Sequence, residues 1–420
     1  MTCTLYTIGP YDTINFVAQA AKRSSTAITS TTEDSDFPLV LVYDGEPDSV
    51  FKFTGADTAS IPILTADLVF NLNPSFTTWT VASHPDGWDD VSSGTGSIEE
   101  ENTIVNSAPA SLQLNSSGGS NNGRARQIVE VIAGNPYTIA VALRGDGTNS
   151  VSAYIRNLQT GKWLNSSSVW TSSKTATASR STGSFSTTTR TFTIEDVATS
   201  GSGVVQLELR AEGVNGTLYV DDFVIWPHWN FAGVFGHNIP DPTTVTTQSD
   251  DNSGFSSPTT RHTHTAPRRR PSFYGSFSTV TERFVRLHMS TVSSGVDKVY
   301  IGEWFIGYTK TLDPGIRSPF SIERSVDLVG GGYGKPFGIQ EEESVSIDTT
   351  VPGLSITEWD VFRLEIGRAG KWGGRSAVLV PDSATEEVHL GLWGIDEARI
   401  NSHFDPSGTF SELKYPIKVR

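Results

Sequence analysis

The sequence predicts a mainly β protein in which one β-sandwich, a jelly roll, is interrupted by a second, inserted β-sandwich and is followed by a C-terminal α+β domain. Between about residues 72 and 226, short β-branched runs alternate with Ser, Thr, Asn and Gly clusters at intervals of roughly ten residues, a spacing typical of sandwiches. Runs such as Gln206–Arg210 alternate apolar and polar residues, the period of a strand with one face in a core. Charged residues make up only 18% of the chain, and few segments have helical spacing, so helices are expected to be scarce.

A chain of 420 residues is too long for one ordinary core, so two or three domains are expected. The predicted division is an N-terminal arm (1–36), a discontinuous jelly roll (37–70 plus 229–310), an inserted sandwich (71–228) and a C-terminal α+β domain (311–420). The arm contains one candidate helix near Thr13–Lys22. It could pack on a neighbouring subunit, or it could be a lead-in strand with a disordered linker.

The outer segments predict further elements. Phe37–Tyr43 is expected to form a buried strand, while Arg283–His288 and Val299–Gly307 are expected to form later strands. Pro240–Pro271 has almost no aliphatic residues, so we expect a loop that is mobile or ordered by another chain. In the last domain, strand pairs are expected around a helix at Ile356–Ile366.

Charge and cysteine usage narrow the possible functions. A formal charge of −15 argues against nucleic-acid binding through the net field, although Arg268–Arg270 forms one basic run in a loop between prolines. Cys3 is the only cysteine, which excludes an intramolecular disulfide and a cysteine metal cluster. The first residues lack a signal-peptide pattern, and no apolar run is long enough to cross a membrane, so we expect synthesis in a cytoplasm and no membrane insertion.

The long β-rich stretch has a distinctive order of motifs. It opens with Asn73-Pro-Ser-Phe76, continues through a strand pair at Gln127–Thr138 and closes with Tyr219-Val-Asp-Asp-Phe223. In this order the stretch resembles carbohydrate-binding modules of families four and nine over roughly residues 71–226. Thr77 stands where that family usually has an acidic residue. The resemblance implies a sugar-binding groove lined by aromatic and amide side chains on a concave sheet.

Four tryptophans could provide flat surfaces for sugar rings, which pack their C–H faces on aromatic rings. Trp79 lies next to the opening motif and is expected in the core, whereas Trp88, Trp163 and Trp170 are candidate binding residues. Trp163 and Trp170 lie in a Ser- and Asn-rich region, where each is either an exposed platform or a residue that packs a hairpin.

Polar side chains along the same strands could bind hydroxyl groups. Guanidinium and amide groups form paired hydrogen bonds with vicinal hydroxyls, so the candidates are Arg124, Arg126, Gln127, Tyr154 and Arg156. Arg126 and Gln127 are adjacent on one strand and point to opposite faces, so only one can enter a given groove. For each candidate, an ordinary solvated position is the alternative.

The resemblance also implies a structural calcium ion, held by a carboxylate of the closing strand together with backbone oxygens near the opening strand. Asp221 and Asp222 match that position, and carboxylate oxygens are ligands that calcium prefers. Neighbouring strand residues point to opposite faces, so only one of the two can serve, and Asp222 is the predicted ligand. The alternative is a plain pair of surface carboxylates.

The sequence contains no signature of an enzyme. A G-x-S-x-G nucleophile elbow is absent, and the acidic clusters, such as Asp89-Asp90, fall in expected loops rather than facing each other across a cleft. We therefore expect no catalysis.

The segments outside the insertion, joined together, resemble another family. A D-G-x-P turn at Asp44–Pro47, a G-H-N turn at Gly236–Asn238 and a final strand at Ile301–Gly307 resemble discoidin-like (galactose-binding-like) jelly rolls of tailed-phage virion proteins. A module whose termini lie close together can be inserted in a loop of such a host.

This second resemblance implies a location and partners. The chain would be made in the host cytoplasm and built into the virion tail, at the tail tip or baseplate, beside other phage tail proteins. Copies arranged as a homo-oligomer around the tail axis would bind host surface polysaccharide through many weak sites. The alternatives are a purely structural tail or head-decoration protein, or a polysaccharide-degrading enzyme or the accessory subunit of a polysaccharide depolymerase.

Overall fold

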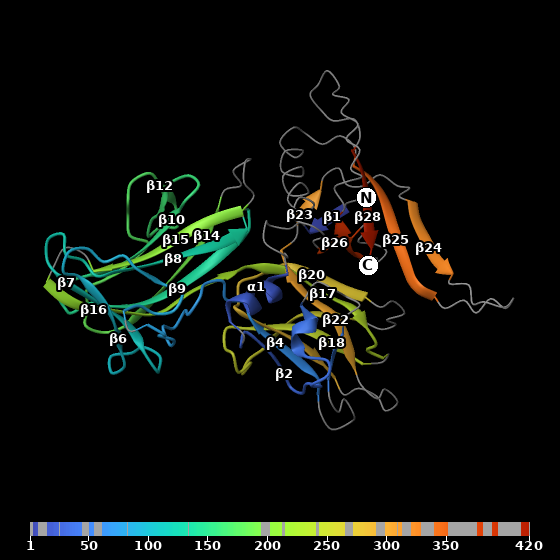
Figure 1. Cartoon of the computed structure of the whole chain (residues 1–420), viewed down its shortest axis with the longest axis horizontal. Coiled ribbons are helices and arrows are strands. Elements are labelled where there is room, and N and C mark those ends of the chain that lie inside the picture. Colours follow the sequence, from blue (N-terminus) through green and yellow to red (C-terminus); the bar gives the residue numbers. More distant parts are fainter. Residues whose placement is uncertain are drawn as a thin grey trace, which may run out of the picture.

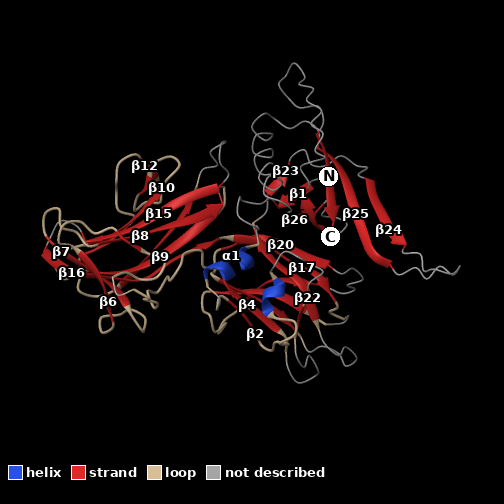
Figure 2. Cartoon of the chain, viewed as in Figure 1, coloured by secondary structure: helices blue, strands red, loops and turns tan. Residues whose placement is uncertain are grey.

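Antiparallel sheets make up most of the chain, as the sequence predicts (Figures 1 and 2). The computed structural model describes residues 3–6, 15–24, 26–43, 50–53, 61–81, 83–132, 134–194, 202–211, 215–240, 243–264, 272–290, 299–308 and 310–312, together with the backbone of strands between 321 and 419. In these residues, five sheets form three groups: an inserted sandwich, a host sandwich and a separate seven-stranded sheet.

The inserted module, residues 71–228, contains two sheets. Its first sheet has the strand order β12 (Trp170–Thr171), β11 (Trp163–Leu164), β10 (Val151–Asn157), β15 (Ser202–Ala211), β8 (Arg124–Ile132) and β5 (Asp89–Asp90), with β13 (Ala178–Arg180) also paired to β10. Its second sheet has the order β14 (Ser186–Thr193), β9 (Pro136–Arg144), β16 (Asn215–Pro227), β7 (Ser111–Ser117) and β6 (Ser97–Glu101).

The host sandwich, residues 15–70 and 229–307, closes around the insertion. One sheet has the order β20 (Ser272–Val280), β17 (Trp229–His237), β22 (Tyr300–Gly307) and β3 (Phe51–Lys52). The other has the order β19 (Thr259–His264), β18 (Val245–Asp250), β21 (Phe284–Met289), β4 (Ile63–Asp67) and β2 (Ile28–Ser30).

The chain crosses between the two sandwiches at two adjacent points. The amide of Phe70, on the way in, donates to the carbonyl of Ile225, on the way out, at 2.9 Å. The buried Asn71 side chain joins the same two segments, because its Nδ2 donates to the Phe223 carbonyl at 2.7 Å and its Oδ1 accepts from the Ile225 amide at 2.9 Å. The expected closeness of the module's termini is therefore confirmed.

The predicted N-terminal helix is present as α1 (Phe16–Arg23), and it belongs to the host sandwich rather than to a free arm. Phe16 and Val17 are fully buried, and the Asn15 side chain caps the helix by accepting from the Val17 amide at 3.1 Å. The Nδ2 of Asn15 also donates to Glu303 Oε1 and to the Trp304 carbonyl, at 2.6 and 2.7 Å. The buried side-chain amide of Asn15 therefore links the helix to β22 through hydrogen bonds.

Two outer predictions were wrong. Leu39–Val42, within the expected strand Phe37–Tyr43, forms a short 3-10 helix after Pro38, with only Val42 fully buried. Pro240–Pro271, expected to be a loop, contributes β18 and β19 to the host sheet. Its β-branched threonines pair well in a sheet, so the lack of aliphatic residues was a misleading signal.

The C-terminal region contributes a seven-stranded sheet in the order β23 (Lys310–Leu312), β1 (Cys3–Tyr6), β26 (Ser376–Val380), β27 (His389–Trp393), β28 (Leu413–Val419), β25 (Gln340–Val351) and β24 (Ser321–Leu328). The first strand of the chain therefore pairs with strands of the last region (Figure 1). The helix expected at 356–366 and the basic run at 268–270 lie outside the described residues. Within the described part of the chain, no helix has the length and hydropathy needed to cross a bilayer.

Candidate functional site

The outer face of the module's first sheet collects most of the predicted binding residues. Alternate residues of its strands point inward and are buried, such as Ala125 and Val129 of β8. The intervening residues point outward, and the strand register places them side by side. We define the outer face by these residues and their loop neighbours: Asp89, Arg124, Arg126, Ile128, Glu130, Tyr154, Arg156, Trp163, Lys174, Gln206, Glu208 and Arg210.

Trp163 is the centre of a cluster of aromatic and cationic groups at one edge of this face. Its ring lies edge-to-face with that of Tyr154, with 6.0 Å between the centroids. The Arg156 guanidinium carbon lies 5.2 Å from the centre of the Trp163 ring, and Lys174 Nζ lies 5.1 Å from it. Trp163 is half-buried, so part of the indole faces solvent among groups that donate hydrogen bonds. This combination of a partly exposed indole and nearby donors can bind a sugar ring.

A row of charged side chains crosses the middle of the outer face. Arg126 lies directly opposite Glu208 on β15 and pairs with Asp89 on its other side, with Nη2 and Oδ2 3.2 Å apart. Lys174 reaches over from a loop, with its Nζ 2.9 Å from Glu208 Oε1 and 4.3 Å from the centre of the Tyr154 ring. These contacts fix the positions of the donors around the aromatic pair.

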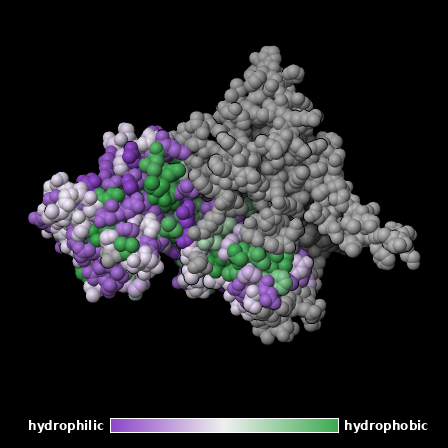
Figure 3. Space-filling model, in the orientation of Figure 1, coloured by the Kyte–Doolittle hydropathy of each residue, from purple (hydrophilic) through white to green (hydrophobic). Residues whose placement is uncertain are grey.

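Apolar side chains complete the outer face. Ile128 is 52% exposed and lies opposite Gln206, and Leu158, just beyond β10, is 37% exposed. Figure 3 shows that the visible surface of the module is mostly hydrophilic, with patches of hydrophobic residues between the polar ones. The face therefore offers both apolar and polar contacts to a ligand.

Two predicted binding residues are buried beneath the sheet. Trp88 is 1% exposed and packs against Phe76 and Phe223, with ring centroids 5.2 and 5.8 Å away, so it cannot stack on a sugar. Gln127 is 3% exposed, and its side chain exchanges hydrogen bonds with Leu72. Its Nε2 also donates to the Gly87 carbonyl at 2.7 Å. Both residues hold the opening segment of the module in place, and neither reaches the outer face.

Trp170 is separated from the Trp163 cluster. It packs edge-to-face on Phe192 of the other sheet, with centroids 5.9 Å apart. Its indole Nε1 donates to the Thr193 carbonyl at 2.8 Å. The interpretation of Trp170 as a packing residue therefore fits, and it closes one edge of the sandwich.

The closing strand contains a bulge at the two adjacent carboxylates. Asp222 has a positive φ of 49°, and the β16–β9 register shifts between Asp221 and Val224. Asp221 is buried and accepts from the amides of Asn106 and Ser107 at 2.8 and 2.9 Å. Desolvation raises the pKa of Asp221 to about 6, and the backbone hydrogen bonds oppose this rise.

The carboxylate of Asp222, the expected calcium ligand, accepts two side-chain hydrogen bonds. One carboxylate oxygen accepts from the side-chain amide of Asn106 at 2.9 Å, and the other accepts from the Ser107 hydroxyl at 2.7 Å. Among the described residues, no three His, Cys, Asp or Glu side chains gather as metal ligands. These hydrogen bonds indicate that Asp222 holds the Asn106–Ser107 loop in place.

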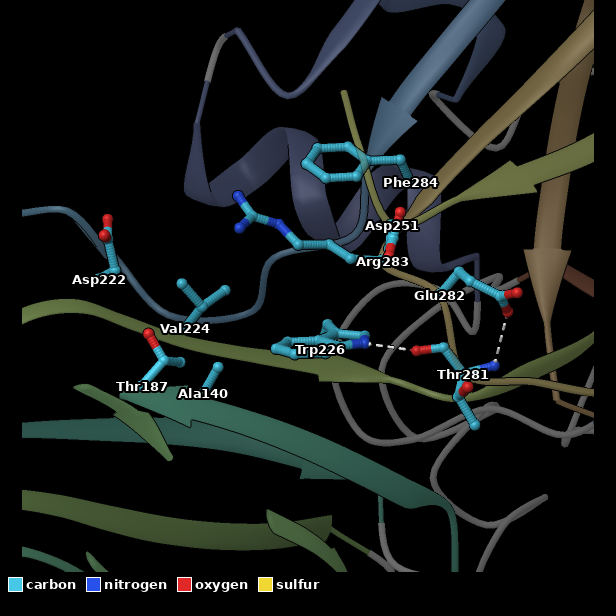
Figure 4. A pocket seen from close by; sticks show the side chains of 10 residues that line it. All are labelled: Ala140, Thr187, Asp222, Val224, Trp226, Asp251, Thr281, Glu282, Arg283 and Phe284. Atoms are coloured by element: carbon cyan, nitrogen blue, oxygen red, sulfur yellow. Dashed lines mark hydrogen bonds between the residues drawn. The ribbon is translucent and has the colours of Figure 1, made fainter. Parts of the chain in front are cut away.

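An open cleft of about 600 Å³ lies between the module and the host sandwich (Figure 4). Trp226 lies along it, and its Nε1 donates to the Thr281 carbonyl of the host at 2.8 Å. Arg283 binds Asp67 in two places and lies 4.8 Å from the centre of the Phe284 ring. The hydrogen bond from Trp226 therefore joins the two sandwiches, whereas the Arg283–Asp67 pair lies within the host.

Sequence reasoning did not single out several members of the outer face, among them Gln206, Glu208 and Lys174. Gln206 and Glu208 belong to a strand that was recognised by its alternation, and pairing that strand with β8 and β10 would have placed them beside Arg126 and Tyr154. Lys174 gave no such signal, because its position depends on how the loop folds over the sheet.

No family model matches the chain, and no curated protein sequence matches it. Similar solved structures include the enzymatically active domain of bacteriophage CBA120 tailspike protein 4, at 10% identity and a TM-score of 0.29, covering 39% of this chain and 22% of that chain. The CBM22-1 xylan-binding domain of Paenibacillus barcinonensis Xyn10C is 14% identical with a TM-score of 0.26, covering 36% and 90%. The module TmCBM61, in complex with β-1,4-galactotriose, is 11% identical with a TM-score of 0.26, covering 38% and 98%.

These identities and TM-scores are too low to indicate a function. The chain spans less than a quarter of the tailspike domain. The proposal that follows therefore rests on the arrangement of this chain's own residues.

Proposed function

We propose that the inserted module binds carbohydrate through the outer face of its first sheet. The observation that carries this proposal is the cluster of Trp163, Tyr154, Arg156 and Lys174 on that face. A half-buried indole offers an apolar surface to sugar C–H groups, and nearby guanidinium and ammonium groups donate to hydroxyls. Five of the residues predicted from the sequence lie on that face: Arg124, Arg126, Tyr154, Arg156 and Trp163.

The face is built to hold its donors in place. Arg126 is paired with Asp89, Lys174 is paired with Glu208, and Arg156 Nε donates to the Gly161 carbonyl at 3.4 Å. Side chains that are already ordered lose less conformational entropy when a ligand binds. This arrangement favours recognition of a ligand over a plain solvated surface.

The proposed role is binding without catalysis. Two described carboxylates of the face already have partners. Glu208 accepts hydrogen bonds from both Lys174 and Gln206, and Asp89 pairs with Arg126. Glycoside hydrolysis needs two carboxyl groups across the scissile bond, one of them as an acid. Their pairing with cations leaves these carboxylates as positioning groups.

We further propose that the chain is a virion component of a tailed phage, at the tail tip or baseplate, and that the module captures host surface polysaccharide during adsorption. This context rests on the resemblance of the outer strands to discoidin-like jelly rolls of phage virion proteins. Several copies around the tail axis, beside other tail proteins, would turn weak single sites into firm attachment. Anchoring by the C-terminal sheet is part of the same proposal.

The test is a binding assay of the full chain against polysaccharides purified from candidate bacterial surfaces, by affinity electrophoresis. Trp163→Ala should abolish retardation, whereas Trp170→Ala, which alters an edge packing contact, should retain it wherever the protein stays folded. Circular dichroism provides the folding control. Binding that survives Trp163→Ala would move the site elsewhere, and a folded parent that binds no polysaccharide would favour the purely structural role.

A further inference from the structure

We propose that the sugar bound by the outer face carries an acidic group, a carboxylate, sulfate or phosphate, which the arginines of β8 and β15 recognise. This inference rests on the proposed carbohydrate binding and adds the chemical class of the ligand.

The charge of the outer face is opposite to that of the whole chain. The chain has 46 acidic and 31 basic residues, excluding histidine. The outer face instead has five cations, contributed by Arg124, Arg126, Arg156, Lys174 and Arg210. It has three carboxylates, from Asp89, Glu130 and Glu208. A local excess of positive charge in an acidic protein attracts anions to this face.

The arginines are arranged unfavourably for the unliganded protein. Arg124 and Arg210 are directly opposite each other on β8 and β15, so their side chains leave the sheet as neighbours. Arg126 follows two residues after Arg124 on the same face. Like charges directly opposite in an antiparallel pair are destabilising. An anion between them would remove this repulsion and accept several hydrogen bonds.

The side chain of Arg124 has no oppositely charged partner among the described residues. No described carboxylate pairs with its guanidinium group, whereas the guanidinium of the neighbouring Arg126 pairs with Asp89. A guanidinium group without a carboxylate partner attracts an anionic ligand and can form charge-assisted hydrogen bonds with it. Guanidinium groups bind carboxylate and phosphate oxygens in pairs, which gives direction as well as attraction.

The aromatic edge of the face supports the same class of ligand. Arg156 makes only a hydrogen bond to Gly161 and a contact with the Trp163 ring, so no described carboxylate neutralises it. A polysaccharide lying on Trp163 would therefore meet Arg156 at one end of the face and Arg124 at the other, and neither pairs with a described carboxylate. A regularly spaced acidic polymer matches this pattern better than a neutral one.

The experiment compares acidic polymers with neutral ones, including pairs that differ mainly in charge. Affinity electrophoresis of the full chain is run in polygalacturonate and its fully methyl-esterified form, in dextran sulfate and neutral dextran, in a phosphate-containing teichoic acid, and in hyaluronate, alginate, galactan and xylan. We expect retardation by at least one acidic polymer, no retardation by the methyl ester or the neutral polymers, and loss of binding when the salt concentration rises several-fold. Arg124→Gln should weaken that binding about tenfold or more, as expected for a charge-assisted hydrogen bond.

The matched control is Arg144→Gln, which removes the same charge from β9 of the other sheet, where Arg144 contacts Tyr219 and Phe185. It should leave binding unchanged, and thermal unfolding of both variants checks the fold. Equal binding of neutral and acidic polymers, or unchanged binding by Arg124→Gln, would overturn the acidic class while leaving carbohydrate binding in place. No binding of any polymer would remove both proposals.

Discussion

Two adjacent residues of β8, Gln127 and Arg126, should separate stability from binding. Gln127 points inward, and its side chain makes three hydrogen bonds, accepting from the Leu72 amide and donating to the carbonyls of Leu72 and Gly87. Arg126 points outward and is paired with Asp89 in solvent. Replacing Gln127 with Met keeps the length of the side chain and removes its polar end.

The expected loss of stability follows from those contacts. A net contribution of about 1 kcal/mol for each hydrogen bond gives a loss of about 3 kcal/mol for Gln127→Met. For a domain of this size, that loss lowers the unfolding midpoint by roughly 6–12 °C. The side chains of Arg126 and Asp89 are 38% and 63% exposed. Solvent screening then limits the loss from Arg126→Gln to less than about 1 kcal/mol.

Differential scanning calorimetry gives the stability of each full-length variant, and affinity electrophoresis well below the midpoint gives its binding. Gln127→Met should be less stable but bind carbohydrate like the parent. Arg126→Gln should be as stable as the parent but bind less well. If Gln127→Met loses binding while its unfolding midpoint is unchanged, then Gln127 contacts the ligand and the assignment of the two faces is wrong.

Three further predictions concern parts of the chain away from the outer face. Asn15→Ala should lower the free energy of unfolding of the host sandwich by about 3 kcal/mol or more, because it removes a helix cap and the buried hydrogen bonds to β22. An unfolding midpoint of the host sandwich equal to the parent's in calorimetry would refute this. The pKa of Asp221 is raised from 3.8 to about 6 in the folded protein. Its contribution to the free energy of unfolding is therefore fully present below about pH 4 and is lost as the pH rises through 6. Urea titrations at several pH values should therefore show a fall in module stability over this window for the parent but not for Asp221→Asn, and equal pH profiles would contradict the assignment. Trp88→Ala should cost about 3–5 kcal/mol as a core deletion, whereas Trp163→Ala should cost much less, and the reverse order in urea denaturation would contradict the burial of Trp88.

Alternation of side chains was enough to predict β8 and β15 of the outer face, but not β5, because Asp89-Asp90 was expected in a loop. The pattern around Arg126 and Gln127 separated the two residues correctly onto opposite faces, because strand periodicity depends on the backbone alone. The pattern of Gln206–Arg210 likewise gave β15. What alternation does not give is which strand lies next to which, so the meeting of Arg126 with Glu208 required the structure.

The wrong predictions of side-chain exposure share one physical cause. Trp88 lies in a segment with turn-forming neighbours, and nothing local shows that this segment folds under the sheet to place the ring between Phe76 and Phe223. Trp163 and Trp170 have similar surroundings in sequence, yet one faces solvent and the other packs on Phe192. Burial of a loop residue depends on contacts distant along the chain, which local composition does not encode.

The junction between the sandwiches determines how a pulling force would travel through the molecule. β16 ends at Pro227 and β17 begins at Trp229, so the last strand of the module runs almost without interruption into the centre of the host sheet. The segment through which the chain enters the module is hydrogen-bonded to β16 through Phe70 and Asn71. A load on the module would therefore reach the host along strands held by neighbours on both sides, with no slack linker to absorb it, so tension at the outer face would become shear on the host sheet.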